Sequence, residues 1–232
     1  MDDRLADLAV LAVFFVGSHF ILSHPPVRKF LIHRWHTWPF RAFYSVISII
    51  LFIQMLVAYG AAPDAALFAP ALTMAPLIAM APATILILCG YTIVNPSAVG
   101  LEDLGKARDI PGILKITRQP VMWGIGLFSL SHMAARPVAA AWIFFGALAV
   151  LALVGGYHLD RRKLAEDDKD WTALAAQSSF VPFAAILGGR ARVTPGQVGW
   201  WRLLGGMTLF AGLLAAHTAV IGVSPLPSDF ML

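Results

Sequence analysis

Six long stretches without Asp, Glu, Lys or Arg determine what this chain can fold into. They cover residues 8–22, 42–60, 71–94, 119–135, 138–159 and 203–222. A helix needs about 20 predominantly apolar residues to cross the hydrocarbon core of a bilayer. We therefore predict an all-α fold, a polytopic membrane helix bundle of about six transmembrane helices, in which residues 1–232 form a single domain.

Composition places the chain in the membrane class and argues against a nucleic-acid partner. Hydrophobic residues make up 59% of the chain and charged residues 13%, with a mean hydropathy of +0.75. These values lie far from those of soluble globular domains. The net charge is +4, but the basic residues alternate with uncharged windows and do not form one continuous patch. The expected partner is the lipid bilayer.

Lysine and arginine are concentrated in alternate loops. Fifteen of the 17 lie in the first, third and fifth loops between the windows, and only Arg4 and Arg136 lie on the other side. By the positive-inside rule these three loops face the cytoplasm and both termini face outward. The N-terminus lacks the basic leader region of a secretory signal, so we expect the first window to remain as a span.

Two loop segments stand apart from this pattern. Residues 180–189 are apolar but too short to cross a bilayer, which predicts an interfacial or re-entrant segment. Residues 160–170 are the most charged run in the chain, and we predict a solvated loop there rather than a catalytic acid cluster. Cys89 is the single cysteine, which excludes an intrachain disulfide and a C-x-x-C-H haem attachment motif.

Three of the seven histidines, His19, His132 and His217, fall inside uncharged windows. An ionisable side chain within a span is a functional-site hypothesis by default. Each imidazole could be satisfied by a neighbouring serine or carbonyl, but three together favour a cofactor site, because histidines on facing helices commonly hold haem iron or another transition metal. Gly124 and Gly126 could admit a flat macrocycle or allow close helix packing.

The depth of each histidine bears on which two could share an iron. His132 lies about 13 residues, or roughly 20 Å, from the cytoplasmic end of its span, whereas His19 lies about 4 residues, or roughly 6 Å, from its own. His217, in the outer half of the last span, matches the depth of His132 better.

A series of short motifs runs from the first window to the C-terminus: Ser18-His19-Phe20, Ser23-His24-Pro25-Pro26-Val27-Arg28, Ala58-Tyr59-Gly60-Ala61-Ala62-Pro63, Ile116-Thr117-Arg118-Gln119-Pro120, Leu130-Ser131-His132, Asp160-Arg161-Arg162, Ser178-Ser179-Phe180-Val181-Pro182-Phe183-Ala184-Ala185-Ile186 and Gly222-Val223-Ser224-Pro225-Leu226. Together they resemble the NnrU family. Several motifs in the right order are more specific than any one of them.

The resemblance implies a location and a chemistry. The family is linked to bacterial denitrification, in nitrite and nitric oxide reduction, which implies a bacterial inner membrane with both termini in the periplasm. Its plant relative, the 15-cis-zeta-carotene isomerase, uses haem b held by histidines to isomerise a carotenoid double bond. The resemblance thus implies haem b, with His132 and His19 as its axial ligands, and an apolar small-molecule substrate from the lipid. The depth argument favours His217 as the second ligand, and both remain open.

The family resemblance also leaves two other functions open. Relatives usually read Arg-His-Pro where this chain has Arg118-Gln119-Pro120. The family is distantly similar to isoprenylcysteine-type methyltransferases, whose Arg-His-Pro turn helps bind S-adenosylmethionine, and Arg118 and the loop around Arg161 are where such a cofactor would be sought. A non-enzymatic accessory factor for nitrogen-oxide respiration is the third interpretation.

Overall fold

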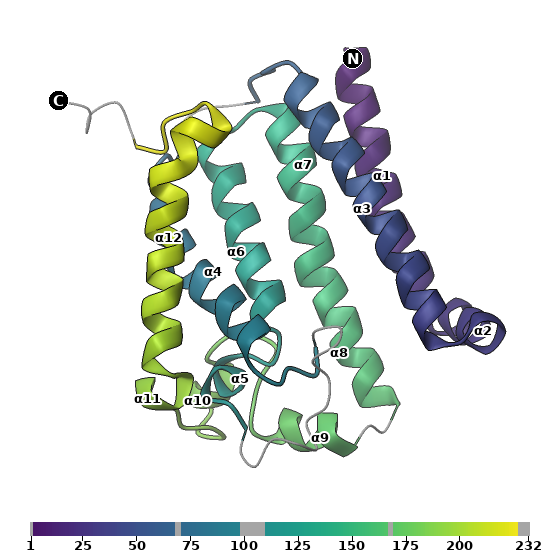
Figure 1. The fold of residues 1–232 in the computed structure, drawn as a ribbon, viewed down its shortest axis with the longest axis vertical. Helices are drawn as coiled ribbons and strands as arrows, with labels where there is room; N and C mark the ends of the chain where they lie inside the picture. Colours follow the sequence, from purple (N-terminus) through teal and green to yellow (C-terminus); the bar gives the residue numbers. More distant parts are fainter. Residues whose placement is uncertain (1, 68–70, 98–109, 167–168, 227–232) are drawn as a thin grey trace.

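The computed structural model describes residues 2–67, 71–97, 110–166 and 169–226, which fold almost entirely into helices (Figure 1). In chain order these are α1 (Asp3–Ser23), α2 (Pro25–Trp35), α3 (Thr37–Ala61), α4 (Ala75–Thr92), α5 (Gly112–Ile116), α6 (Pro120–Ala135), α7 (Ala139–Ala149), the π-helical segment η2 (Val150–Gly155), α8 (Gly156–Ala165), α9 (Lys169–Ala176), α10 (Ala184–Leu187), α11 (Pro195–Val198) and α12 (Trp200–Ile221). The predicted all-α class is confirmed.

Helices occupy all six uncharged windows. In the part of the chain that the structure describes, five helices are long and apolar enough to cross a membrane. They are α1, α3, α4, the continuous helix Ala139–Ala165 made of α7, η2 and α8, and α12. The fourth window forms α6, which has only 16 residues. The chain is therefore a multi-pass membrane protein, and the prediction of about six spans agrees with this arrangement.

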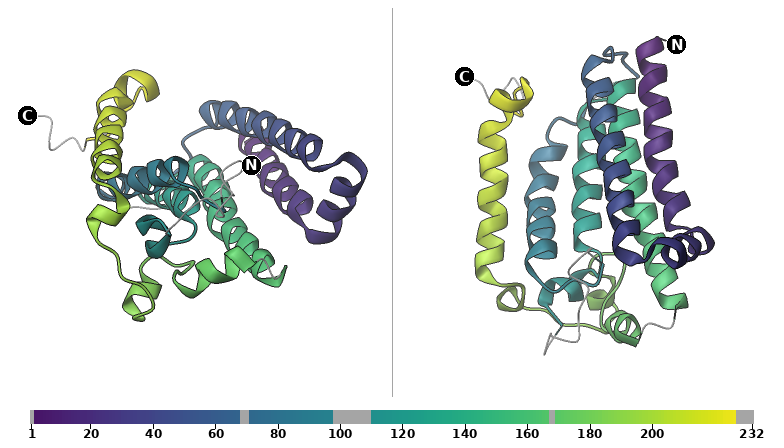
Figure 2. Two further views of the ribbon diagram at one scale, coloured as in Figure 1. Left: turned by 60° about the horizontal axis from the view of Figure 1, so that its bottom comes forward. Right: turned by 45° about the vertical axis from the view of Figure 1, so that its right-hand side comes forward.

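The long helices stand side by side in one bundle (Figures 1 and 2). Helix α4 packs against both α6 and α12, α6 packs against α7, and the pair α1 and α3 packs against α7. Both chain termini lie at one end of the bundle, which we call the terminal end. The opposite end carries α2, α5 and α9 to α11, and we call it the basic end.

Glycines allow the central helices to approach closely. A Cβ atom on Gly206 of α12 would lie 2.7 Å from the Ile85 Cα atom of α4. A Cβ on Gly124 of α6 would lie 2.8 Å from the Ala83 carbonyl oxygen of α4. Small residues are the usual means of helix contact in membranes, where the hydrophobic effect does not drive helices together.

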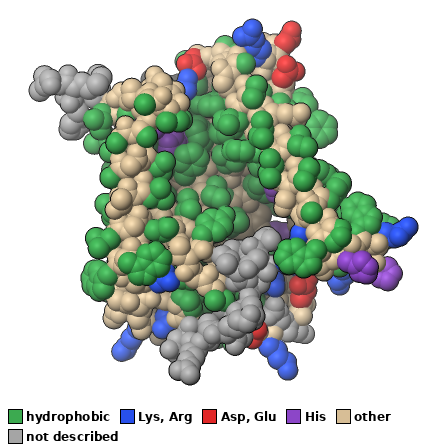
Figure 3. All heavy atoms as spheres, in the orientation of Figure 1, with side chains coloured by type: hydrophobic (Ala, Val, Ile, Leu, Met, Phe, Trp, Pro, Cys, Tyr) green, Lys and Arg blue, Asp and Glu red, His purple; other side chains and the backbone are tan. Residues whose placement is uncertain are grey.

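The outer surface of the bundle is apolar, as a lipid environment requires. Helices α3 and α12 expose large hydrophobic side chains, including Val46, Ile49, Ile53, Val57, Leu204, Leu213 and Val220. Figure 3 shows hydrophobic side chains over the two flanks of the visible face and over the hollow between α12 and α3. The exposed side chains would be unfavourable in water but stable against acyl chains.

The structure corrects the prediction for the charged run 160–170. Instead of beginning a solvated loop, its first residues continue the fifth span as α8 up to Ala165, and Asp160 is only 2% exposed. The π-helical segment η2 precedes α8 and was also not expected from the sequence. Segments of this kind shift the register of the helix that follows and often occur at functional sites.

The apolar segment 180–189 folds back against the start of α6 at the basic end. It contains the short helix α10, and Phe183, in the left-handed conformation with φ of 65°, donates its backbone N–H to the Ile116 carbonyl oxygen at 2.9 Å. The segment does not form a transmembrane span, and it packs at the basic end of the bundle.

Replacing Gly124 by alanine should lower the melting temperature of the detergent-purified protein, because the new methyl group would meet the Ala83 backbone at 2.8 Å. Overpacking of this kind costs about 1–3 kcal/mol. Gly212→Ala on α12 is the matched control, since nothing lies within 4 Å of its Cβ position. Equal melting temperatures for the two variants would contradict the close α4–α6 contact.

Candidate functional site

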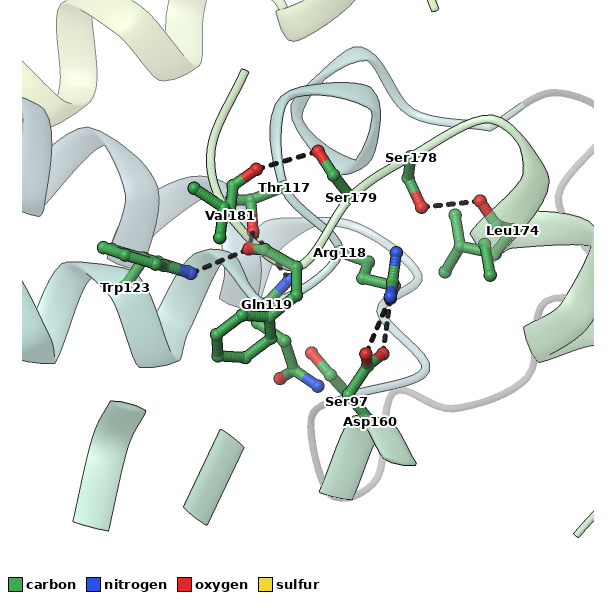
Figure 4. A network of polar contacts seen from close by, with 12 residues as sticks. Ser97, Thr117, Arg118, Gln119, Trp123, Asp160, Leu174, Ser178, Ser179 and Val181 are labelled. Atoms are coloured by element: carbon green, nitrogen blue, oxygen red, sulfur yellow. Dashed lines mark hydrogen bonds and ion pairs between the residues drawn. The ribbon is translucent and has the colours of Figure 1, made fainter. Parts of the chain in front are cut away.

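The turn before α6 is the most densely hydrogen-bonded part of the basic end (Figure 4). The Thr117 hydroxyl donates to the Phe180 carbonyl oxygen at 2.8 Å and accepts the backbone N–H of Gln119 at 3.2 Å. The backbone N–H of Arg118 donates to the Ser179 carbonyl oxygen at 3.1 Å. Pro120 at the first position of α6 disfavours helical geometry in the residue before it, so the turn cannot continue as helix.

Arg118 and Asp160 form a buried ion pair across this turn. The guanidinium contacts both carboxylate oxygens, Nε with Oδ1 and Nη2 with Oδ2, the second at 2.7 Å. The side chains are only 10% and 3% exposed. A two-pronged pair of this kind fixes the position and orientation of both groups, and it ties the start of α6 to α8.

Gln119, next to this pair, is fully buried, and its side chain makes no hydrogen bond within the part of the chain that the structure describes. The residue is 0% exposed, and neither Oε1 nor Nε2 has a partner among the described residues. Leaving such an amide unpaired costs about 1–3 kcal/mol per group. An unsatisfied buried donor and acceptor at one position calls for a water, an ion or a ligand that pairs with them.

Of the three intramembrane histidines, His132 and His217 lie within electrostatic range of each other. The Nδ1 atom of His132 lies 2.7 Å from the Phe128 carbonyl oxygen, and that of His217 lies 2.8 Å from the Val223 carbonyl oxygen. A carbonyl only accepts, so each Nδ1 carries the proton and each Nε2 is left with a lone pair. The two imidazoles are close enough to interact electrostatically.

His132 lies among aromatic rings near the terminal end of α6. Its ring centroid is 4.4 Å from that of Phe128 and 5.1 Å from that of Phe145 on α7. One turn further on, Arg136 donates to the Tyr59 hydroxyl at 3.1 Å and to Asp64 at 2.6 Å. Partial burial is the largest single influence and disfavours the Arg136 cation, but the hydrogen bonds that Arg136 donates to Asp64 and Tyr59, together with the charges of these groups, outweigh it, and the pKa of Arg136 is raised.

His19 lies in a different part of the bundle. It is near the basic end of α1, where its Nδ1 donates to the Phe15 carbonyl oxygen at 2.6 Å and its ring centroid is 5.2 Å from that of Tyr44 on α3. Helix α1 runs toward the basic end and α6 runs away from it. At 1.5 Å per residue, His19 and His132 differ in depth by roughly 14 Å. The structure therefore does not bring these two imidazoles together.

The glycines of α6 have a packing role. Gly124 faces α4, and a Cβ on Gly126 would lie 2.6 Å from the Leu153 side chain of η2. Neither leaves room for a macrocycle. Within the described ranges, no group of three or more His, Cys, Asp or Glu side chains could hold a metal ion.

Sequence reasoning missed Asp160 and the buried state of Gln119. The signal available for Asp160 was its place directly after an uncharged window, only one residue beyond the predicted end of the span. Gln119 was noted for its identity, but nothing in the sequence shows that its amide is enclosed.

These features define a class: an all-α, multi-pass membrane protein with a buried Arg–Asp pair at one end of the bundle and two histidines within electrostatic range of each other toward the other end. A family model described as NnrU protein matches residues 7–225. The chain belongs to the NnrU family. Comparisons with curated proteins and with solved structures found no match.

Replacing Asp160 by asparagine should strongly destabilise the protein, because it leaves the Arg118 cation buried without a counter-charge. Breaking a buried pair in this way costs about 3–5 kcal/mol. Asp64→Asn is the matched control, since its pair with Arg136 is exposed and such pairs contribute about 0–1 kcal/mol. Unfolding of both variants in mixed micelles with increasing denaturing detergent measures the difference, and similar midpoints would contradict a structural role for the buried pair.

Proposed function

We propose that this protein binds haem b toward the terminal end of the bundle, and that His132 of α6 and His217 of α12 are the residues that would hold its iron. The observation that carries the proposal is that two imidazoles within electrostatic range of each other have their Nδ1 atoms held by backbone carbonyls, at 2.7 and 2.8 Å. Hydrogen bonds of this kind fix the tautomer and ring orientation of metal-binding histidines and raise their basicity.

The surroundings of the pair suit an apolar macrocycle. Helix α12 packs on α4, and Figure 3 shows an apolar hollow in the face between α12 and α3. Phe128 and Phe145 border the His132 ring and would exclude water from it. Because helix packing fills the space beside Gly124 and Gly126, these glycines would not contribute to binding the macrocycle.

When bound, haem b would supply a redox-active iron, and the protein would set its properties through ligand identity, hydrogen bonding and burial. The chain's own residues would orient the imidazoles and keep the site apolar. A substrate that partitions into lipid, such as nitric oxide or an apolar polyene, would reach it laterally. This supports a role in nitrogen-oxide reduction or in isomerisation, in a bacterial inner membrane with both termini in the periplasm.

His19 remains the alternative second ligand that the family resemblance implies. Its Nδ1 is held by a carbonyl in the same way, so its Nε2 is also suited to a metal. Pairing it with His132 would require a change in the relative depth of α1 and α6.

The reduced-minus-oxidised absorption spectrum of the detergent-purified protein tests the proposal. We expect a b-type spectrum that is lost in His132→Ala and lost or shifted in His217→Ala, with His33→Ala, an exposed histidine on α2, as the control. If the b-type spectrum were lost in His19→Ala and retained in His217→Ala, the second ligand would be His19. A colourless protein with an unchanged melting temperature, even after haem is supplied, would overturn the proposal.

A second candidate function is supported by the buried amide of Gln119. A ligand with a donor and an acceptor side by side, such as the adenine of S-adenosylmethionine, would satisfy both Oε1 and Nε2. Arg118 is already paired with Asp160, so recognition would depend on the amide. This candidate corresponds to a methyltransferase-like protein.

The variant Gln119→Leu tests whether the buried amide of Gln119 binds a ligand. We expect the variant to lose binding of S-adenosylmethionine in calorimetry while its unfolding free energy is unchanged or higher, because it removes two unpaired polar atoms. Gln119→His, which restores the residue usual in relatives, is the companion variant. No heat of binding with the unmodified protein would exclude this candidate.

A further inference from the structure

A second polar cluster lies at the basic end, on the face of α8 opposite to Asp160. His158 and Arg162 are four residues apart and therefore share one face of the helix. This face meets the ends of α1 and α3: the Phe20 ring centroid is 6.3 Å from that of His158, and Arg162 Nη1 donates to the Ser23 carbonyl oxygen at 3.3 Å. Tyr44 of α3 is within electrostatic range of Arg162.

Two nitrogen atoms of this cluster are buried without a hydrogen bond. Neither Nε2 of His158 nor Nε of Arg162 has a partner within the described ranges. The Glu166 carboxylate lies 3.8 Å from Arg162 Nε, beyond hydrogen-bond distance, and is 37% exposed. The Arg162 side chain is only 12% exposed, and its Nε–H donor has no acceptor among the described residues.

The charges that face Arg162 leave the cluster positive. Arg28 of α2 repels it, and Glu166 is the one carboxylate acting on it among the described groups. The Tyr44 hydroxyl and the His158 imidazole add hydrogen-bonding groups to this cluster. An anion with several acceptor oxygens would relieve the repulsion and accept the unused donors.

The position of the cluster indicates where such an anion would come from. Helix α2 and the start of α3 expose Phe30, Trp35 and Trp38 beside basic residues, and Arg41 lies over the Trp38 ring at 5.5 Å. Exposed tryptophans with neighbouring arginines mark the depth of lipid headgroups. Basic sites between helices on the cytoplasmic side are known to hold anionic headgroups.

We propose that Arg162, Arg28, His158 and Tyr44 form a binding site for a phosphate group, supplied by the headgroup of an anionic phospholipid in the cytoplasmic leaflet. The guanidinium of Arg162 would donate to the phosphate oxygens, and Arg28 would complete the charge balance. The phospholipid's acyl chains would lie along α1 and α3. The site is distinct from the His132–His217 pair, and it does not depend on haem.

Native mass spectrometry of the full-length protein, released from detergent micelles containing phosphatidylglycerol, tests this site. We expect one tightly retained phosphatidylglycerol, with an apparent affinity weakened by about tenfold or more in Arg162→Gln. Arg161→Gln is the matched control, because it removes the same charge from the neighbouring, exposed residue. If both variants lost the same affinity for phosphatidylglycerol, net charge alone would explain the binding, and the proposal would be overturned.

A second variant keeps the test informative if Arg162→Gln fails to fold. Tyr44→Phe removes one hydroxyl without changing charge, and we expect it to weaken phosphatidylglycerol binding about three- to tenfold. Phosphatidylcholine and inorganic phosphate form the other two arms of the experiment. Retention of phosphatidylcholine as strong as that of phosphatidylglycerol would overturn the proposal, and competition by millimolar phosphate would assign the site to the free anion instead of the lipid.

Discussion

The buried pair of Arg118 and Asp160 is the interaction on which the basic end of the bundle depends. Burying charged groups away from water costs free energy. This pair is tolerated because two guanidinium nitrogens of Arg118 donate hydrogen bonds to both carboxylate oxygens of Asp160. It joins two segments 42 residues apart, the turn before α6 and the end of the fifth span. The pair holds the turn before α6 against α8. Gln119 is buried on the side of α8 that carries Asp160, and His158 and Arg162 lie on the opposite side, facing α1 and α3.

One helix serves two polar clusters because residues two apart in an α-helix point in nearly opposite directions. Within α8, Asp160 faces Arg118, while His158 and Arg162 face α1 and α3. The π-helical segment η2 directly before α8 packs against α6 through Leu153 and Gly126 and shifts the register of the helix that follows. The uncharged window that predicted a simple span thus contains an element that affects how α8 is oriented.

The two ends of the bundle offer different chemistry. Toward the terminal end, two imidazoles have their Nδ1 atoms held by carbonyls, and that of His132 stands among phenylalanines, which suits a metal within an apolar macrocycle. At the basic end, the Arg162 guanidinium has a donor without a partner among the described residues, beside a second cation, which suits a phosphate. The proposed haem and the proposed lipid would therefore occupy separate sites, and each can be tested while the other is left intact.

The sequence by itself determined the helical class, the positions of the spans and the segregation of basic residues to one end, because hydropathy and loop charge act locally along the chain. It also singled out His132, His217 and His19. Only the tertiary structure decided that His132 lies within electrostatic range of His217, that Gly124 serves packing against α4, and that Asp160 is buried rather than solvated. These facts depend on which helix faces contact one another. Close contacts between segments far apart in the sequence decide this, and the hydropathy of a single segment carries no information about them.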